Sequence, residues 1–446
     1  MKIFFCLKTF LPNQVAGTEI YVAGLAKGLM QKGHDVAVVK PNYESKEFTT
    51  YDYEGIKVLE YPESSFNDKD LQTGKKFPEG ISAYEELLKK EQPDAIHFHE
   101  ISGSNGITIQ HLRIAVNLKI RVFTTFHLIR YVCKTSTLLY KNHHVCDGVI
   151  NITKCAVCTL HQKGLPGFVA NIAGNAGALI NKLGIDLSNK KNKTATATLL
   201  NYPQYIIDHK NILNEIFELS EKVFVLNNWF SKILLKNNLP GNKILIVPQA
   251  LPYLNTHLPV PTIEINTEVK IRLVYVGRIC KIKGLDILLK AFNAINKLDV
   301  SLDIYGKVTE ENFYQDCLAL SKNNKQINWK GIAEPGEIIP LLKNYDLLIF
   351  PAMVQEMSPF ITLEAFAAGI PVLASDIYAN REEIIEGKNG WLYKFRNMLS
   401  LQNKLKYLLE NSDEIKKAKG NIPNIRRFDK VVEKHIEVYH SFLESN

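Results

Sequence analysis

The stretch that decides the fold runs from Gln355 to Gly369 and reads QEMSPFITLEAFAAG. Buried strands are predicted on both sides of it, at residues 345–351 and 370–375. Strand, helix and strand in this order predict a parallel sheet, and open α/β sheets bind ligands at such strand-to-helix junctions. Ser358 suits the N-cap and Pro359 the first helical turn. We therefore expect a helix start there, with free backbone N–H groups that can bind an anion such as a diphosphate.

The alternation of strands and helices continues through most of the chain. A length of 446 residues favours two domains, and the pattern restarts after a proline-containing segment without periodicity. The predicted fold class is α/β, with two doubly wound Rossmann-like domains facing a cleft. The predicted parts are an N-terminal domain at 1–252, a linker at 253–268, a C-terminal domain at 269–425, and a final helix at 426–446 that packs back on the N-terminal domain.

The first half is expected to hold strands at residues 2–7, 35–40, 93–99, 121–127, 222–226 and 244–248, with a helix at 19–31. The second half is expected to hold further strands at 271–277 and 302–306 and helices at 284–295 and 335–344.

Composition narrows the class of protein. Hydrophobic residues make up 46% and charged residues 22%, as in globular proteins, and no apolar run is long enough to span a membrane. The segment from Met1 to Leu7 predicts a first strand rather than a signal peptide, so we expect a cytoplasmic protein. The net charge of +8 indicates a solvated surface or weak attraction to an anionic membrane face or a phosphate-bearing substrate. Arginines and aromatics do not interleave, so no nucleic-acid partner is expected.

Two of the three cations in the loop after the first strand of the second half stand five residues apart. This loop runs from Gly277 to Gly284, reads GRICKIKG and precedes a predicted helix. Arg278 and Lys283 would neutralise a diphosphate leaving group without a catalytic metal.

This loop, together with Glu356 and Glu364 eight residues apart, resembles the signature of retaining, nucleotide-sugar-dependent glycosyltransferases of family GT4, which have the GT-B fold. The resemblance covers nearly the whole chain. It extends to further short matches at residues 17–19, 33–36, 374–377 and 386–390.

The resemblance implies a role for each matching residue. Arg278 and Lys283 would hold the donor diphosphate, Glu364 the ribose hydroxyls, and Glu356 the sugar, where it would stabilise charge at the anomeric carbon. His127 would stand near the reacting sugar, as the second residue of the catalytic set with Glu356. The remaining implied donor-binding residues, which approach the donor mainly through their backbone, are Gly17, Ser358, Pro359, Phe360 and Ile361.

The implied reaction is transfer of a sugar, with retention of configuration, from a UDP-sugar or GDP-sugar to a glycan or lipid-linked acceptor. No catalytic metal is implied, and the leaving phosphate would act as the base in a front-face attack. Three alternatives stay open: an inactive GT-B scaffold that binds sugar nucleotides, a GT-B epimerase, which would lack the Arg278–Lys283 element, and a phosphorylase, which would need a longer chain.

Four of the seven cysteines cluster within an expected insert at about 128–165, namely Cys133, Cys146, Cys155 and Cys158. Four thiolates suit a tetrahedral structural zinc, and a similar cluster occurs in a subset of GT4 enzymes. Two disulfides, free buried thiols and an iron–sulfur cluster are the alternatives, and a nearby histidine could replace one ligand.

The stretch at about 164–213 resembles an insertion. Residues 170–183 are apolar and rich in small side chains, which predicts either a packed helix or a face for a lipid acceptor or membrane surface. The second reading would place the protein peripherally at the inner face of a membrane.

Overall fold

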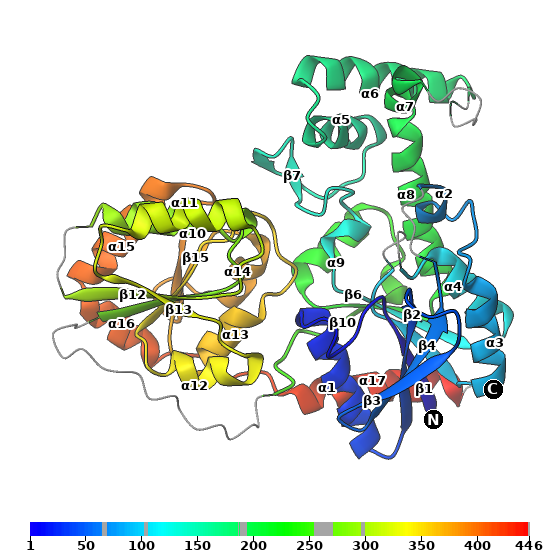
Figure 1. The fold of residues 1–446 in the computed structure, drawn as a ribbon, viewed down its shortest axis with the longest axis horizontal. Helices are drawn as coiled ribbons and strands as arrows, with labels where there is room; N and C mark the ends of the chain where they lie inside the picture. The colour runs from blue at the N-terminus through cyan, green and yellow to red at the C-terminus, as the bar shows by residue number, and fades with distance from the viewer. Residues whose placement is uncertain are drawn as a thin grey trace. The chain divides into compact units, whose positions relative to one another are not determined.

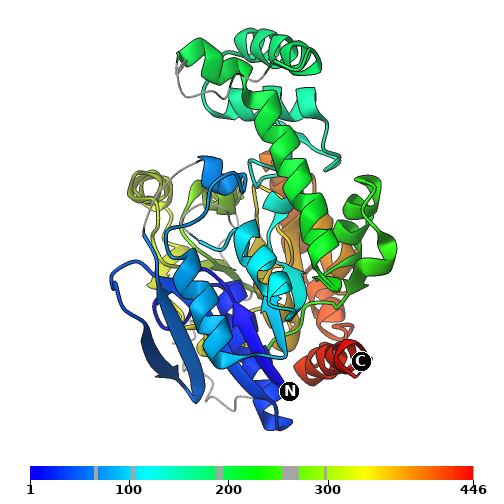
Figure 2. The same cartoon turned by 90° about the vertical axis from the view of Figure 1, so that its right-hand side faces the viewer.

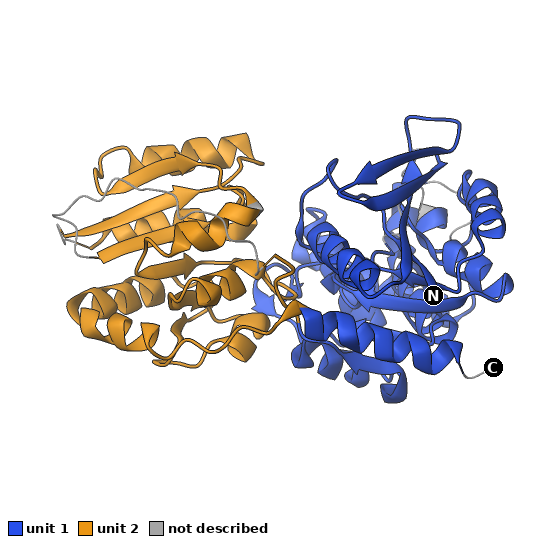
Figure 3. Ribbon diagram, turned by 90° about the horizontal axis from the view of Figure 1, so that it is seen from below, with its two compact units in different colours: residues 1–248, 429–446 blue, residues 249–428 orange. Residues whose placement is uncertain are grey.

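The computed structural model describes residues 1–64, 69–101, 106–185, 187, 194–253, 271–295 and 299–444. Its contacts divide the chain into two compact units, Met1–Pro248 with Asp429–Asn446, and Gln249–Phe428 (Figure 3). The predicted linker at 253–268 lies outside the described residues, except for Tyr253.

The first unit is built on an eight-stranded sheet in the order β10-β9-β6-β5-β1-β2-β4-β3. All its described pairs are parallel except β3 with β4, which form an antiparallel hairpin. The central strand β1 is almost wholly buried because a parallel sheet is covered on both faces. The strands are β1 (Lys2–Cys6), β2 (Asp35–Asn42), β3 (Thr49–Tyr53), β4 (Ile56–Pro62), β5 (Ala95–Phe98), β6 (Arg121–Phe126), β9 (Lys222–Val225) and β10 (Ile244–Ile246).

Helices connect these strands and cover the sheet. They are α1 (Gly17–Gln31), α2 (Lys69–Gln72), α3 (Ile81–Glu91), α4 (Ile109–Asn117), α5 (Ile152–Gln162), α6 (Gly167–Lys182), α7 (Ala195–Leu200), α8 (Tyr202–Leu219) and α9 (Asn228–Lys236). Between β6 and α5 lie the short helix η1 (Ile129–Tyr131) and a small hairpin of β7 (Leu139–Tyr140) and β8 (His144–Val145); η2 (Gly241–Lys243) precedes β10.

Helices α5, α6 and α7 stand away from the sheet of the first unit. The long helix α8 runs from them back to the sheet (Figures 1 and 2). This group of helices occupies the stretch that the sequence identifies as insertion-like. We call it the projecting helical group, residues 152–182 and 195–219.

The last helix, α17 (Phe428–Leu443), belongs to the first unit from Asp429 onward. Tyr439 contacts His97 of β5, with 2.6 Å between the hydroxyl and Nδ1. His435 stacks on Phe224 of β9, with ring centroids 4.5 Å apart. The C-terminal end of the chain thereby closes one face of the N-terminal sheet.

The second unit has a six-stranded sheet, all of its described pairs parallel, in the order β13-β12-β11-β14-β15-β16. Its strands are β11 (Ile271–Val276), β12 (Val300–Tyr305), β13 (Ile327–Gly331), β14 (Leu347–Phe350), β15 (Val372–Ser375) and β16 (Gly390–Tyr393). Its helices are η3 (Lys281–Lys283), α10 (Leu285–Asn293), α11 (Glu311–Ser321), η4 (Pro335–Glu337), α12 (Ile338–Leu342), α13 (Phe360–Ala367), α14 (Tyr378–Glu383), α15 (Met398–Glu410) and α16 (Ser412–Lys419).

The predicted fold class of two doubly wound α/β units is confirmed. The predicted hydrophobic strands are present, each shortened or extended by a few residues. Sequence reasoning missed the hairpin of β3 and β4. Glu54 and Gly55 form its turn, and both have positive φ angles. Within the described residues, no helix combines the length and the apolar character needed to cross a bilayer.

Candidate active site

The loop after β11 is shaped by close backbone contacts that only glycine permits. Gly284 has a φ of +71°, and a Cβ there would lie 2.0 Å from the carbonyl oxygen of Pro351. A Cβ on Gly306, after β12, would lie 1.9 Å from the carbonyl oxygen of Gly277. The carboxyl ends of β11, β12 and β14 are therefore drawn together, at the edge where open α/β sheets bind ligands.

Lys283 and Glu356 meet at this edge. Lys283 Nζ donates to both carboxylate oxygens of Glu356, at 2.7 and 2.9 Å. Each side chain is 18% exposed, so the pair is shielded but open to a ligand. The same ammonium lies 5.6 Å from the ring centre of Phe350. The cation predicted for the diphosphate and the carboxylate predicted for the sugar are thus direct neighbours.

Arg278 lies at the surface of the same loop. Its side chain is exposed, and its carbonyl oxygen accepts a hydrogen bond from the buried Tyr275 hydroxyl at 3.0 Å. Tyr275 thereby holds the backbone of this loop from inside the sheet. The arginine remains in reach of solvent and of an incoming anion.

Glu364 is a buried carboxylate on α13. It accepts a very short hydrogen bond from the hydroxyl of Tyr253, and burial raises its pKa to about 7, with the tyrosine hydrogen bond acting in the opposite direction. The ring of Tyr253 also meets that of Phe360 edge to face, with centroids 6.3 Å apart. Sequence reasoning missed Tyr253, because 111 residues separate it from its partner and no local spacing marks the contact.

The start of α13 differs from the prediction. Pro359, not Ser358, is the N-cap; its backbone is extended, with φ −71° and ψ 124°, and no side chain caps the helix. Proline holds φ near this value, so the helix begins one residue later, at Phe360. Pro359 has no N–H group, so it cannot donate to a ligand. The N–H groups of Phe360 and Ile361 remain at the uncapped first turn.

Two buried polar groups beside this helix start have no hydrogen-bond partner within the described part of the chain. These are Gln355 Nε2 and Thr362 Oγ1. The other end of the Gln355 amide accepts from the backbone N–H of Tyr378 at 2.8 Å, which fixes its direction. Buried polar groups are nearly always satisfied in native proteins, so unpartnered ones beside an uncapped helix start favour a ligand site.

The predicted residues of the first unit lie at the carboxyl ends of its central strands. Gly17 is the exposed first residue of α1. His127 follows β6, and its Nε2 lies 3.1 Å from Nδ1 of His99, which follows β5. Burial lowers the pKa of His127 to about 3, so the imidazole is neutral at pH 7. It can exchange hydrogen bonds but cannot serve as a cationic acid.

His99 belongs to a cluster of stacked histidines. Its ring stacks on that of His97 with centroids 4.4 Å apart. His97 is in turn held by the Tyr439 hydroxyl at 2.6 Å and the Thr125 hydroxyl at 2.7 Å. The alternation of His97, in β5, with His99, just after it, was the sequence signal for this cluster.

A buried acid accompanies Gly17 on α1. Glu19 accepts a hydrogen bond from the Thr9 hydroxyl at 2.8 Å, and burial raises the pKa of its carboxyl. Its second oxygen has no partner within the described residues. The Gly17–Glu19 motif therefore places an unsatisfied acceptor next to the exposed start of this helix.

The four clustered cysteines line one cavity of about 30 Å³ under α5, together with other residues of the β7–α5 region. None of the four takes part in a disulfide in this structure. The backbone N–H group of Lys141 donates to Cys158 Sγ at 3.2 Å. Such a bond stabilises a thiolate, while burial raises the pKa of Cys155 to about 11.

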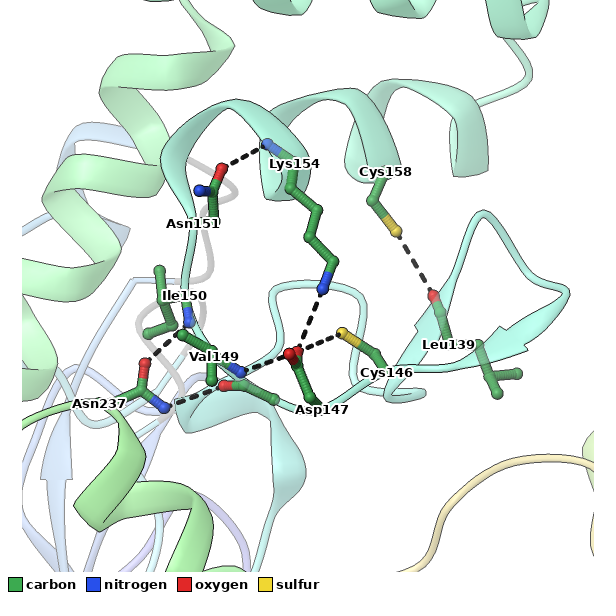
Figure 4. Close-up of polar contacts among 10 residues, drawn as sticks. Leu139, Cys146, Asp147, Val149, Ile150, Asn151, Lys154, Cys158 and Asn237 are labelled. Carbon is green, nitrogen blue, oxygen red and sulfur yellow. Dashed lines mark hydrogen bonds and ion pairs between the residues drawn. The ribbon is translucent and has the colours of Figure 1, made fainter.

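Individual contacts still hold the sulfurs apart. Cys146 Sγ donates to Asp147 at 3.6 Å and Cys158 Sγ to the Leu139 carbonyl at 3.4 Å (Figure 4). Among the residues that the structure describes, no three histidine, cysteine or acidic side chains are placed as a metal ion would need. The zinc site stays a prediction.

Comparison with known proteins finds a family match in each half of the chain. The family model for glycosyl transferases group 1 matches residues 263–426, and that for Glycosyltransferase Family 4 matches residues 15–167. Each half of the chain thus matches a glycosyltransferase domain model, and the fold is that of GT-B enzymes. The boundaries of the two matches fall in the two units described above.

Two curated relatives show how far the likeness extends. Spore coat protein SA of Bacillus subtilis is 30% identical over 162 residues, which are 34% of this chain and 42% of that protein. The uncharacterized glycosyltransferase MJ1607 of Methanocaldococcus jannaschii is 22% identical over 399 residues, 88% of this chain and 85% of that one. The matches thus range from less than half to most of a relative's length.

Solved structures share the fold along the whole chain. A glycosyltransferase from Rickettsia africae superposes with a TM-score of 0.64 at 17% identity, covering 100% of this chain and 99% of that one. HepE of Anabaena, solved in complex with UDP-glucose, gives a TM-score of 0.57 at 11% identity and covers 100% of this chain and 98% of that one. At this identity the likeness establishes the GT-B fold.

Proposed function

We propose that this protein transfers a sugar from a nucleoside-diphosphate sugar to an acceptor, with retention of anomeric configuration. The observation that carries the proposal is the shielded pair of Lys283 and Glu356 at the carboxyl edge of the second sheet. A cation for the leaving diphosphate and a carboxylate for the developing positive charge are the two electrostatic elements that sugar transfer requires.

The donor is held by residues of the second unit. Lys283 exchanges its carboxylate partner for the diphosphate, which frees Glu356 to contact the sugar. Arg278 adds a second cation from the exposed side of the loop. The N–H groups of Phe360 and Ile361 contact the phosphate or sugar at the helix start, where the helix dipole favours negative charge. Ser358 adds its N–H from the turn, and Pro359 shapes the turn without donating.

Glu364 receives the ribose hydroxyls, and the donor is a UDP-sugar or a GDP-sugar. A raised pKa suits this carboxyl to hydrogen bonding with neutral hydroxyls, because a protonated or shared carboxyl is less costly to bury. The two cations neutralise the diphosphate, so the proposed reaction uses no catalytic metal. The crystal structure of Anabaena HepE with UDP-glucose is in keeping with a donor of this kind.

Two residues of the first unit, His127 and Gly17, are also proposed to take part in the reaction. The neutral imidazole of His127 donates or accepts a hydrogen bond at the sugar, since its lowered pKa excludes a cation at pH 7. Gly17 leaves room for the diphosphate because it has no side chain. The departing phosphate takes the proton of the acceptor hydroxyl on the face where the new bond forms, which gives retention.

The acceptor is a glycan or a lipid-linked glycan, and the protein works peripherally at the inner face of a membrane. The net charge of +8 supports contact with anionic lipid. We further propose that Cys133, Cys146, Cys155 and Cys158 hold a structural zinc, supported by their shared cavity and by the Lys141 N–H group that donates to Cys158. Binding would draw the sulfurs from their separate hydrogen bonds onto the metal.

The test is a panel of UDP-, GDP- and ADP-sugars, read by thermal shift and by donor turnover. We expect sugars of one nucleotide to stabilise the protein. The anomeric carbon in the product should keep the configuration that it has in the donor. Lys283→Ala should abolish both signals, whereas Lys406→Ala on the exposed face of α15 should leave them intact. No response to any nucleotide sugar, or a product with inverted configuration, would overturn the proposal.

A further inference from the structure

Helix α6 of the projecting helical group has its large apolar side chains on the wrong side for a helix in a globular protein. Its buried positions are occupied by small residues, namely Ala170, Ala173, Gly174 and Gly177. Its exposed positions carry large apolar residues, with exposed fractions of 68% for Phe168, 66% for Ile172, 61% for Leu179 and 68% for Leu183 just beyond the helix end. We call these four residues the α6 face.

The small residues explain how α6 is seated. A Cβ on Gly174 would lie 2.5 Å from Val157 of α5, and one on Gly177 would lie 2.1 Å from the carbonyl oxygen of Leu200. The helix therefore packs backbone-close against its neighbours and cannot rotate its large side chains inward without a clash. The outward direction of the α6 face is built into the fold.

The four residues of the α6 face share one side of the helix. Positions 168, 172, 179 and 183 follow the spacing of four, seven and four residues that places side chains above one another on a helix. The helix has 16 residues, about 24 Å in length, and lies at the far end of the group from the sheet (Figures 1 and 2). That is a long apolar stripe left open on the surface of the first unit.

The charged side chains that the structure describes on α6 and directly before it are lysines. Lys182 is the only charged residue in α6, and Lys163 before it is also exposed. Lys141 reaches the helix from the β7–β8 hairpin and donates to Asn171 at 3.3 Å. From residue 148 to residue 207 the sequence holds one acid, Asp186, against six lysines, at positions 154, 163, 182, 190, 191 and 193.

We propose that the α6 face docks on the surface of an anionic lipid bilayer, with α6 lying in the interface. A large apolar stripe with lysines at its border and no acid in the helix matches the anionic headgroup region outside and the acyl chains beneath. A protein partner would be expected to meet a rim of mixed charge. Only one part of this proposal rests on the proposed function, namely that the membrane presents a lipid-linked acceptor to the enzyme.

The test uses the full chain and vesicles of phosphatidylcholine, with or without about one quarter phosphatidylglycerol. We expect co-sedimentation with the anionic vesicles, weakened by salt. Ile172→Glu and Leu179→Glu should each weaken binding by about tenfold or more, because each removes a buried apolar side chain and adds a repelled charge. Leu399→Glu is the matched control, an equally exposed leucine of α15, 58% exposed, and should bind like the unaltered protein.

A second readout does not depend on loss of binding. Phe168→Trp should shift its emission to the blue, and brominated acyl chains should quench it, only when anionic vesicles are present. Thermal stabilisation by the nucleotide sugar should persist in all these variants, so a failed donor site and a failed docking face are told apart.

Three results would overturn the proposal. One is no vesicle binding by a protein that still responds to its donor. Another is equal binding to neutral vesicles, which would remove the role of the lysines. The third is a lipid-free dimer that Leu179→Glu dissociates and that ignores vesicles, which would make the α6 face a contact between two copies of this chain.

Discussion

The two units of this molecule hold their ionisable groups in opposite ways. In the second unit, Lys283 and Glu356 form a charged pair that a ligand can reach and separate. In the first unit, His97, His99 and His127 are buried and uncharged, joined to each other by stacking and hydrogen bonds. A pair of charges can be exchanged for a charged substrate, whereas a neutral cluster fixes geometry. The donor side is built to respond to its ligand, and the histidine side to stay as it is.

A fall in pH should produce the largest difference in stability between the two units. Burial lowers the pKa of His127 to about 3 and of His435 to about 4, against 6.5 in the unfolded chain. Below pH 6.5 the unfolded state binds protons that the folded state refuses, so stability falls as the pH falls. From pH 7 to pH 5 each histidine should cost the first unit about 2 kcal/mol. Hydrogen exchange of peptides from β5 and α17 should accelerate accordingly.

Glu364 gives the opposite sign in the second unit. Its folded pKa of about 7 lies above the unfolded value of 4.5, so its contribution to stability is lost as the pH rises toward 7 and regained on acidification. Peptides from α13 should therefore be less sensitive to the same step. His435→Gln should flatten the acid response of the first unit alone. Equal acceleration in both units, or an unchanged slope in that variant, would contradict the assignment of neutral histidines.

The donor side should show its largest effect in catalysis. Glu356→Gln keeps the shape of the side chain and removes the negative charge, so donor turnover should fall by about 10²–10³-fold. Thermal stabilisation by the nucleotide sugar should persist, because Lys283 is then freed for the diphosphate. Glu410→Gln on the exposed end of α15 is the matched control. A variant that binds the donor and turns it over at the normal rate would remove Glu356 from the catalytic role.

The same contrast explains what could be predicted from the sequence. Arg278 with Lys283, and Glu356 with Glu364, are fixed by spacing within one loop or one strand-to-helix segment. Local spacing can be read directly from a sequence. The apolar runs that form strands such as β11 and β14 can be recognised in the same way. The fold class and the candidate donor residues therefore followed from the sequence.

Contacts between segments that lie far apart in the chain could not be predicted from the sequence. Tyr439 reaches His97 across 342 residues, and no local pattern pairs a histidine of β5 with the last helix. The sequence predicted Tyr253 as the first residue of a linker, yet its hydroxyl donates a hydrogen bond to the Glu364 carboxylate. Pro359 illustrates a smaller limit, because serine followed by proline favours a helix start without deciding which residue is the cap. Tertiary contacts decided the first two cases, and the backbone of proline decided the third.

The cysteine cluster tests whether the rigid side depends on a metal. If zinc closes the cluster, the purified protein should carry about one zinc per chain. Cys155→Ser should release the metal and lower the Tm of the first unit by several degrees, at about 2–4 °C for each kcal/mol lost. Cys280→Ser, in the core of the second unit, is the control that changes packing without touching the cluster. Metal-free protein whose Tm is unchanged by both Cys155→Ser and a chelator would contradict the zinc site and leave four free thiols.

The smallest expected effect comes from Tyr253, whose hydroxyl competes with the donor for the Glu364 carboxylate. The Tyr253 hydroxyl donates to the carboxylate proposed to receive the ribose, so donor binding has to displace it. Tyr253→Phe removes this competitor, and a net hydrogen bond of about 1 kcal/mol predicts donor affinity about fivefold tighter by calorimetry. Tyr407→Phe, on the exposed side of α15, should change nothing. Weaker binding by Tyr253→Phe would mean instead that the hydroxyl stays and supports the ribose, because a competitor's removal cannot reduce affinity.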